Sequence, residues 1–153
     1  MTELEIRRWR SVIEEITNLV LGFPERENNP WLKNYPHSSC DVMSFAVGAT
    51  LLQRYGEEWH IVSYLADADF TAHTWLTLEK NGSTYAWIDP TIRQFQGFAH
   101  EPFYGFGSSP ALRSFSSQLG PPLPISKITN DWHNQGTQEI YEWLFSELEI
   151  YHF

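Results

Sequence analysis

The sequence predicts an α+β fold in which helices flank a small antiparallel sheet. Stretches near both ends of the chain repeat apolar side chains with the 3.6-residue spacing of amphipathic helices, and a middle stretch is apolar or small almost all round. Three segments rich in β-branched and aromatic residues follow that middle stretch. We therefore expect a buried central helix packed on an antiparallel sheet. Because 153 residues suffice for one domain and little more, residues 1–153 are expected to form a single domain.

The first helix is predicted over residues 4–21. Apolar residues recur there at helical spacing, and Gly22 and Pro24 follow as stop signals. Residues 25–37 are polar, contain two prolines and include a few large apolar side chains. This composition predicts a connecting loop held in place by aromatic anchors.

The central helix is predicted over residues 39–55. Ser38 and Ser39 are good N-cap residues, Asp41 suits the first turn, and Gly56 can end the helix. Because its middle is apolar or small on almost every side, this helix is expected to be buried among its neighbours.

Strands are predicted over residues 60–66, 72–79 and 83–89, which are rich in β-branched and aromatic residues. Ser44 and Gly48 follow Cys40 by about one and two helical turns, so another element is expected to approach the helix closely on that face. These strands are the candidates for that element.

The residue composition changes in the last third of the chain. Residues 97–124 contain four Gly and five Pro with interspersed aromatic residues, which predicts an ordered but irregular loop. That loop either lines a binding cleft or is a plain surface excursion. Helical periodicity returns over residues 137–151 and predicts a C-terminal helix.

Charge and cysteine content exclude several classes of protein. Ten Lys and Arg against nineteen Asp and Glu give a net charge of −9, which disfavours nucleic acid and anionic membranes as partners. The lone cysteine, Cys40, excludes an intramolecular disulfide and a multi-cysteine zinc site. The first nine residues do not resemble a secretory signal, and no apolar run is long enough to span a membrane. We expect a cytoplasmic protein, or one exported without a cleavable signal as an effector.

The hairpin around residues 80–83 admits two registers, and the loop length decides which side chains share a face. A two-residue loop at 81–82 would put Asp89 on the opposite face from His73. A three-residue loop at 80–82 would pair these two residues directly, close enough for the imidazole to donate a hydrogen bond to the carboxylate. We predict the three-residue loop, which also pairs aromatic residues. It opposes Glu79 to Ser83, Thr77 to Tyr85, Trp75 to Trp87 and His73 to Asp89.

An imidazole held by a carboxylate is an oriented base, and the nucleophile that it most plausibly serves is Cys40. A thiol at a helix N-terminus meets the positive end of the helix dipole, which is expected to lower its pKa, and the free N–H groups there can hold an oxyanion. The neighbouring charge of Asp41 acts in the opposite direction and raises the thiol pKa.

These residues resemble a known family. Residues 40–56, the segment Ala-His-Thr-Trp at 72–75 and the segment Trp-Ile-Asp-Pro-Thr at 87–91 look like the core of transglutaminase-like and papain-related thiol enzymes. The pieces are similar also to papain-like deamidase domains of bacterial effectors and toxins. The resemblance covers residues 39–95 and implies a papain/transglutaminase-like core.

The resemblance assigns a role to each residue of the motif. It implies that Cys40 is the nucleophile, His73 the general base and acid, and Asp89 the group that orients His73. Asn34, six positions before Cys40, is the candidate for the oxyanion-stabilising residue, and Trp75 would border the substrate. The chain departs from the animal transglutaminases at Asp41, where they carry an aromatic residue, so hydrolysis or deamidation is favoured over cross-linking.

The predicted activity is acyl transfer from a carboxamide, with a protein or peptide as substrate and no cofactor. Deamidation of a glutamine side chain ranks first, hydrolysis by a cysteine peptidase of the same fold second, and amine cross-linking third. The negative charge fits a basic partner protein.

Three other interpretations stay open at this point. The cysteine could be an inert buried residue. The chain could be a catalytically inactive relative that binds a protein through its aromatic loop at 98–115. His37 could form a metal site with Cys40 and either His60 or His100, although metal sites need three or four convergent ligands, so we expect no metal.

Overall fold

The computed structural model describes residues 2–128 and 135–151. They form three helices, α1 (Thr2–Leu21), α2 (Cys40–Tyr55) and α3 (Gln135–Leu148). Six strands form one antiparallel sheet in the order β4-β3-β2-β1-β5, and β6 also pairs with β1. The strands are β1 (His60–Ala66), β2 (Ala72–Lys80), β3 (Ser83–Ile88), β4 (Tyr104–Phe106), β5 (Phe115–Gln118) and β6 (Leu123–Pro124).

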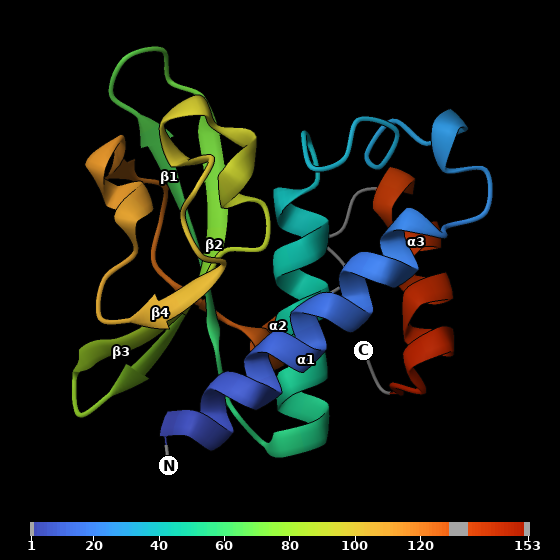
Figure 1. Cartoon of the computed structure of the whole chain (residues 1–153), viewed down its shortest axis with the longest axis horizontal. Helices are drawn as coiled ribbons and strands as arrows, with labels where there is room; N and C mark the ends of the chain where they lie inside the picture. Colours follow the sequence, from blue (N-terminus) through green and yellow to red (C-terminus); the bar gives the residue numbers. More distant parts are fainter. Residues whose placement is uncertain (1, 129–134, 152–153) are drawn as a thin grey trace.

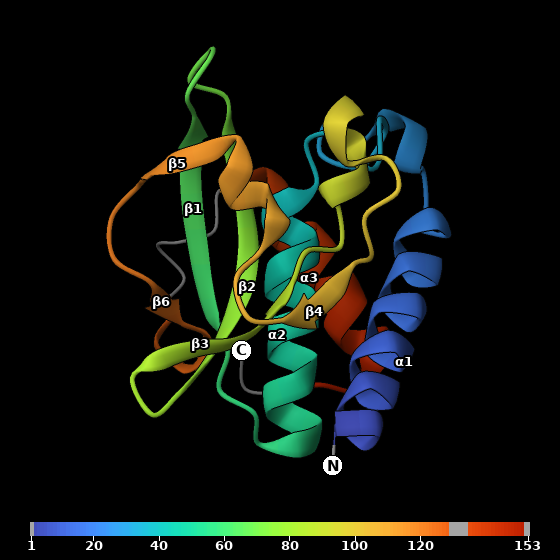
Figure 2. The same ribbon diagram turned by 60° about the vertical axis from the view of Figure 1, so that its left-hand side comes forward.

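The predicted α+β arrangement is confirmed, with the helix that begins at Cys40 packed on the antiparallel sheet. Helix α2 lies in the middle, with the sheet on one side and α1 and α3 on the other (Figures 1 and 2). No helix in the described part of the chain is long and apolar enough to cross a membrane.

The sheet carries a hydrophobic cluster on each face. Alternate residues of β2 point to opposite faces, so Leu76 and Leu78 join the main core with α2, while Trp75 joins a second cluster. The second cluster is completed by residues from the short 3₁₀ turns and the edge strand β5. Its buried members are Val62, Ala66, Trp75, Trp87, Ile92, Phe98, Ala111 and Phe115.

Helix α2 is buried along nearly its whole length because its small residues admit neighbours. The Ser44 hydroxyl donates a hydrogen bond to the Thr74 carbonyl of β2 at 3.3 Å. Gly48 faces Ile125 and Leu76 so closely that a Cβ there would lie 2.6 Å from Ile125 Cδ1. The close approach expected at both residues is therefore present.

The ends of α2 differ in how far they match the prediction. Gly56 ends the helix with a left-handed φ of 67°, as expected. Ser39 stands at the N-cap position, but its hydroxyl donates to the Trp31 carbonyl at 2.7 Å and does not cap the helix. The capping role predicted for Ser39 is therefore wrong, and the side chain ties the preceding loop to the helix instead.

Residues 97–124 contribute more regular structure than predicted. The sequence indicates an irregular loop, whereas β4, β5 and β6 all lie in this stretch and extend the sheet at its edges. These strands are only two to four residues long. Their local sequence carries little strand signal because pairing with β1 and β3 defines them.

The β2–β3 hairpin has a two-residue loop at Asn81 and Gly82, so the predicted three-residue loop is wrong. Lys80 pairs with Ser83 across it. Asn81 and Gly82 have φ values of 54° and 80°, and Asn-Gly is the pair that best accepts two consecutive positive φ angles in a tight hairpin turn.

A β-bulge at Tyr85 then changes the register. Glu79 pairs with Thr84 but Leu78 pairs with Ala86, so Tyr85 is an extra residue in β3. Beyond the bulge every residue of β3 is displaced by one position relative to a regular two-residue hairpin.

The bulge returns Asp89 to the face of His73, whereas a two-residue loop alone would turn Asp89 to the opposite face. Thr77 now lies opposite Trp87, so the predicted pairing of Trp75 with Trp87 is wrong. Because side chains alternate along each strand, His73 and Asp89 share the face of Thr77 and Trp87. They are diagonal neighbours and not directly opposed, which corrects the predicted register while bringing the two side chains together.

We expect Gly48→Ala to lower the free energy of unfolding by about 1–2 kcal/mol, which is the overpacking cost less the gain in helix propensity. The added Cβ would meet Ile125 at 2.6 Å. Chemical denaturation measures the change. Gly97→Ala is the control, since nothing lies within 4 Å of a Cβ at Gly97. Gly48→Ala should cost less free energy of unfolding in an Ile125→Val background, because valine lacks the Cδ1 atom that the new Cβ would meet. An equal cost in both backgrounds would refute this packing argument.

Candidate active site

His73 and Asp89 form a fully buried hydrogen-bonded pair. His73 is the second residue of β2 and Asp89 directly follows β3. His73 Nε2 lies 2.7 Å from Asp89 Oδ2, and both side chains are 0% exposed. The Asp89 backbone N–H donates to the Phe103 carbonyl at 2.7 Å, which fixes the backbone from which the carboxylate projects.

Aromatic rings surround the imidazole of His73. Phe95 meets it edge-to-face with ring centroids 4.7 Å apart, and Phe115 and Trp75 lie at 5.3 and 5.5 Å. This apolar surrounding raises the pKa of Asp89 through burial, and the hydrogen bond from His73 acts against that rise. The rings thus hold the pair away from water.

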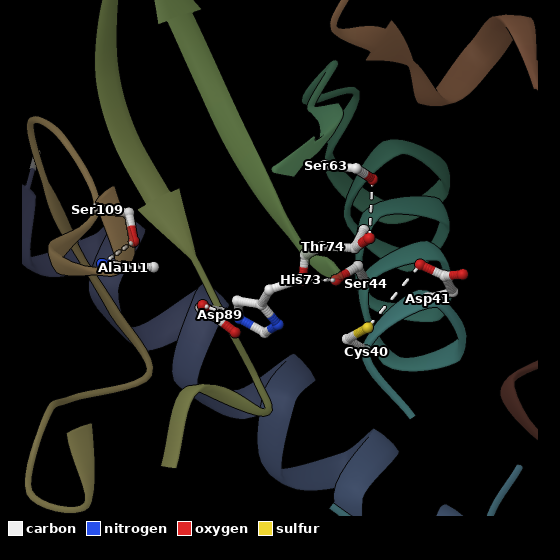
Figure 3. Close-up of polar contacts among 9 residues, drawn as sticks. All are labelled: Cys40, Asp41, Ser44, Ser63, His73, Thr74, Asp89, Ser109 and Ala111. Atoms are coloured by element: carbon white, nitrogen blue, oxygen red, sulfur yellow. Dashed lines mark hydrogen bonds and ion pairs between the residues drawn. The ribbon is translucent and has the colours of Figure 1, made fainter. Parts of the chain in front are cut away.

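The hydrogen bond with Asp89 assigns the two ring nitrogens of His73. When Nε2–H donates to the carboxylate, a neutral imidazole carries its lone pair on Nδ1. Nδ1 is buried and has no hydrogen-bond partner among the described residues. In Figure 3, Asp89 lies on one side of the ring and Nδ1 is turned to the side on which Cys40 lies. In that tautomer Nδ1 is the ring nitrogen able to accept a proton.

Cys40 is the first residue of α2 and is partly exposed. Its thiol donates a weak hydrogen bond to Asp41 Oδ1 at 3.9 Å and interacts with Thr74, the residue after His73 in β2. These contacts involve Asp41 and Thr74, whereas the hydrogen bond of Asp89 is made with His73. The structure thus joins His73 to Asp89, and the Cys40 thiol bonds to neither.

The thiol is protonated at neutral pH. Burial, followed by the negative charge of Asp41, raises the pKa of Cys40 to about 12. The backbone N–H of Thr74 lowers this pKa, but by less. The lowering expected from the helix N-terminus is therefore wrong for this structure, because desolvation of the thiolate outweighs the helix dipole.

The two remaining candidate residues, Asn34 and Trp75, are not hydrogen-bonded to the His73–Asp89 pair. Asn34 is exposed in the loop before α2, where its carbonyl accepts a hydrogen bond from the His37 N–H at 2.8 Å. Trp75 is 1% exposed and stacks on Tyr64 in the second cluster, so its ring presents no free face to a substrate.

Three residues of the site are missing from the sequence prediction. The place of Thr74 could be inferred from strand alternation, because neighbouring residues point to opposite faces and Thr74 therefore faces α2. Phe95 closely follows the Asp-Pro-Thr turn in the sequence, so its proximity to Asp89 could be inferred. Phe115 carries no such signal, because its place beside His73 depends on β5 pairing with β1.

The described residues contain no group of three or more His, Cys, Asp or Glu side chains placed to hold a metal ion. The metal site considered for His37 and Cys40 therefore has no counterpart in that part of the chain.

Comparisons with protein-family models, with curated proteins and with solved structures find no match to this chain. Any assignment of function therefore depends on the residues themselves and on the geometry of the site.

Alkylation of Cys40 by iodoacetamide should be slow in the folded protein at pH 8 and should rise about tenfold per pH unit toward a midpoint near 12. Asp41→Asn removes a charge that opposes ionisation, so this variant should react faster with a lower midpoint. Asp67→Asn, at an exposed carboxylate bonded to Ser116, is the matched control. Rates are measured by mass spectrometry. A midpoint at or below the value for the unfolded chain would contradict the burial argument.

Proposed function

We propose that this chain is a cysteine-dependent acyl-transfer enzyme that acts on carboxamides, with deamidation of a protein glutamine side chain as its reaction. The observation that carries the proposal is the buried His73–Asp89 pair, whose second ring nitrogen, Nδ1, is unpartnered on the side of Cys40. A buried imidazole oriented by a carboxylate is the arrangement that a general base requires. The order of Cys40, His73 and Asp89 along the chain supports the same assignment, as does their resemblance to transglutaminase-like and papain-related enzymes.

In the first half-reaction the Cys40 sulfur attacks the carboxamide carbon and a carbon–sulfur bond forms. The thiol proton passes to His73 Nδ1, and the imidazolium is stabilised by Asp89. The imidazolium then protonates the leaving nitrogen, the carbon–nitrogen bond breaks, and ammonia departs from a thioester. Backbone N–H groups at the start of α2 are suited to hold the oxyanion.

In the second half-reaction water replaces the sulfur. His73 Nδ1 removes a proton from water as the water attacks the thioester, and the proton returns to sulfur as the carbon–sulfur bond breaks. The products are a carboxylic acid and the original thiol, so no cofactor is consumed.

The high pKa of Cys40 determines how the proton moves. An enzyme with a preformed thiolate needs no proton transfer during attack, whereas a thiol with a pKa of about 12 must lose its proton as sulfur bonds to carbon. His73 is therefore required as a base in the attack itself. The acidic charge balance of the chain favours a basic protein as substrate. Peptide hydrolysis is the alternative reaction of the same residues, with an amine in place of ammonia.

A second candidate function is that of an inactive relative that binds a protein. It is favoured by the complete burial of His73 behind aromatic rings and by the raised pKa of Cys40. In this case the segment 98–115 would supply the binding surface, and Cys40 would have no chemical role.

Ammonia release from glutamine-containing basic proteins tests the first function against the second. Cys40→Ala and His73→Ala should each lower the rate by about 10³-fold or more, and Asp89→Asn by about 10²–10⁴-fold, because the imidazole would lose its orientation. Glutamate formation in the substrate is confirmed by mass spectrometry. Amine release from peptides in place of ammonia would identify a peptidase.

The controls separate catalysis from folding. Asp67→Asn alters a carboxylate outside the site and should retain full activity, and the melting temperature of each variant shows whether it is folded. If folded Cys40→Ala releases ammonia at the original rate, Cys40 is not the nucleophile. If the unaltered protein binds a partner equally well with Cys40→Ala and turns over nothing, the binding-module function stands in its place.

A further inference from the structure

A pocket of about 520 Å³ lies between α1 and residues 102–104, and its lining includes none of Cys40, His73 and Asp89. Its size is in the range of small-molecule sites. Helix α1 and the segment leading into β4 lie beside each other, as the hydrogen bond of Arg10 to Tyr104 requires (Figure 2). The charged members of the wall are Arg10 and Glu14 from α1 and Arg93 from the 3₁₀ turn Ile92–Gln94.

Both arginines are held by neutral groups. Arg10 donates from Nε and Nη2 to the hydroxyl oxygen of Tyr104, at 3.1 and 2.8 Å. Arg93 donates from Nε to the Glu101 carbonyl at 2.8 Å, and its guanidinium lies 4.2 Å from the ring centroid of Phe103. Neither guanidinium has a carboxylate within 4.0 Å among the described residues. Their positions are fixed, while their charges stay uncompensated by direct ion pairs.

Arg10 and Arg93 keep these unpaired charges in a chain that carries nine more acidic than basic groups. By contrast, Arg54 is bound by Glu15, and Arg113 by Glu101, each at 2.6 Å. Arg10 retains Nη1 and Arg93 retains both Nη groups as donors. The Tyr104 hydroxyl accepts from Arg10, so its own proton is available for donation.

The rest of the wall combines apolar side chains with two polar ones, Thr17 and Asn18 of α1. Ile13, Pro102 and Phe103 line the pocket together with the ring of Tyr104. A ligand that fits this wall has an anionic group for the two guanidiniums and a small apolar body for the rings. Glu14 stands on the same wall and opposes anion binding near Arg10.

We propose that this pocket binds a small organic anion, a carboxylate or a phosphate monoester, through Arg10, Arg93 and Tyr104, with its apolar part against Ile13 and Phe103. The two anionic groups share the same recognition chemistry, since each accepts paired hydrogen bonds from a guanidinium. The hollow shape and its volume favour a small molecule over an extended partner.

The test uses benzoate and phenyl phosphate as anionic probes and benzamide as the neutral analogue. Binding to the full chain is followed by the ¹⁵N–¹H signals of the arginine Nε groups, since those of Arg10 and Arg93 are hydrogen-bonded in the structure. We expect benzoate, phenyl phosphate or both to shift these two signals, and benzamide to leave them unchanged. The probe that binds more tightly identifies the carboxylate or the phosphate class.

Three variants assign the effect to the pocket. Arg93→Gln and Arg10→Gln should weaken binding about tenfold or more, because each removes a charged hydrogen-bond donor. Glu14→Gln should strengthen it, since a repelling carboxylate is lost. Arg113→Gln is the matched control outside the pocket wall and should leave the affinity unchanged.

If a variant fails to fold, probe binding to the unaltered protein still tests the proposal. The proposal is overturned if neither anion shifts the signals of Arg10 and Arg93 at millimolar concentration, if benzamide shifts them equally, or if the shifts map to other arginines. Ammonia release is not part of this readout, so its absence would leave the pocket proposal intact.

Discussion

The hydrogen bond between His73 and Asp89 governs the second hydrophobic cluster of this protein. Two polar side chains lie fully buried there among aromatic rings, where an unpaired carboxylate would lose several kcal/mol of hydration. Their mutual bond offsets much of that loss, and the Asp89 backbone is fixed in turn by Phe103. The rings that exclude water also fix the orientation of the imidazole. The packing of this cluster therefore also determines how the His73 imidazole is oriented.

Cys40 lies at the start of α2, where the interactions that act on its thiol oppose one another. Helix α2 brings its N-terminal N–H groups to Cys40, but burial of the thiol and the charge of Asp41 outweigh them, and the pKa rises to about 12. Thr74 connects α2 to β2, since it interacts with the thiol and its carbonyl accepts the Ser44 hydrogen bond, while its neighbour His73 packs among the aromatic rings. The imidazole of His73 is thus oriented by the fold, whereas burial and the charge of Asp41 keep the Cys40 thiol protonated at neutral pH.

The sequence alone predicts the helices and the three long strands well, because their apolar spacing and end signals are local. It predicts that His73 and Asp89 meet, but it does so through the wrong register. The Asn81-Gly82 turn carries a local signal for a two-residue loop, whereas the bulge at Tyr85 has none, and the face of Asp89 depends on both. Phe115 and the short edge strands are likewise determined by pairing with distant segments. The pKa of Cys40 depends on burial in the folded chain, which no spacing rule conveys.

The extra residue at Tyr85 also bears on how this hairpin changes during evolution. Loss of Tyr85 would leave Leu78 opposite Ala86 and Asp89 on the face of His73, whereas regular pairing of Tyr85 with Leu78 would turn Asp89 to the helix-facing side of the sheet. A three-residue loop without the bulge would keep the shared face. A deletion at the bulge therefore shortens β3 by one residue without separating His73 from Asp89. An alignment of diverged sequences that counts positions from the turn would misplace the carboxylate by one residue, although the pair itself had been retained.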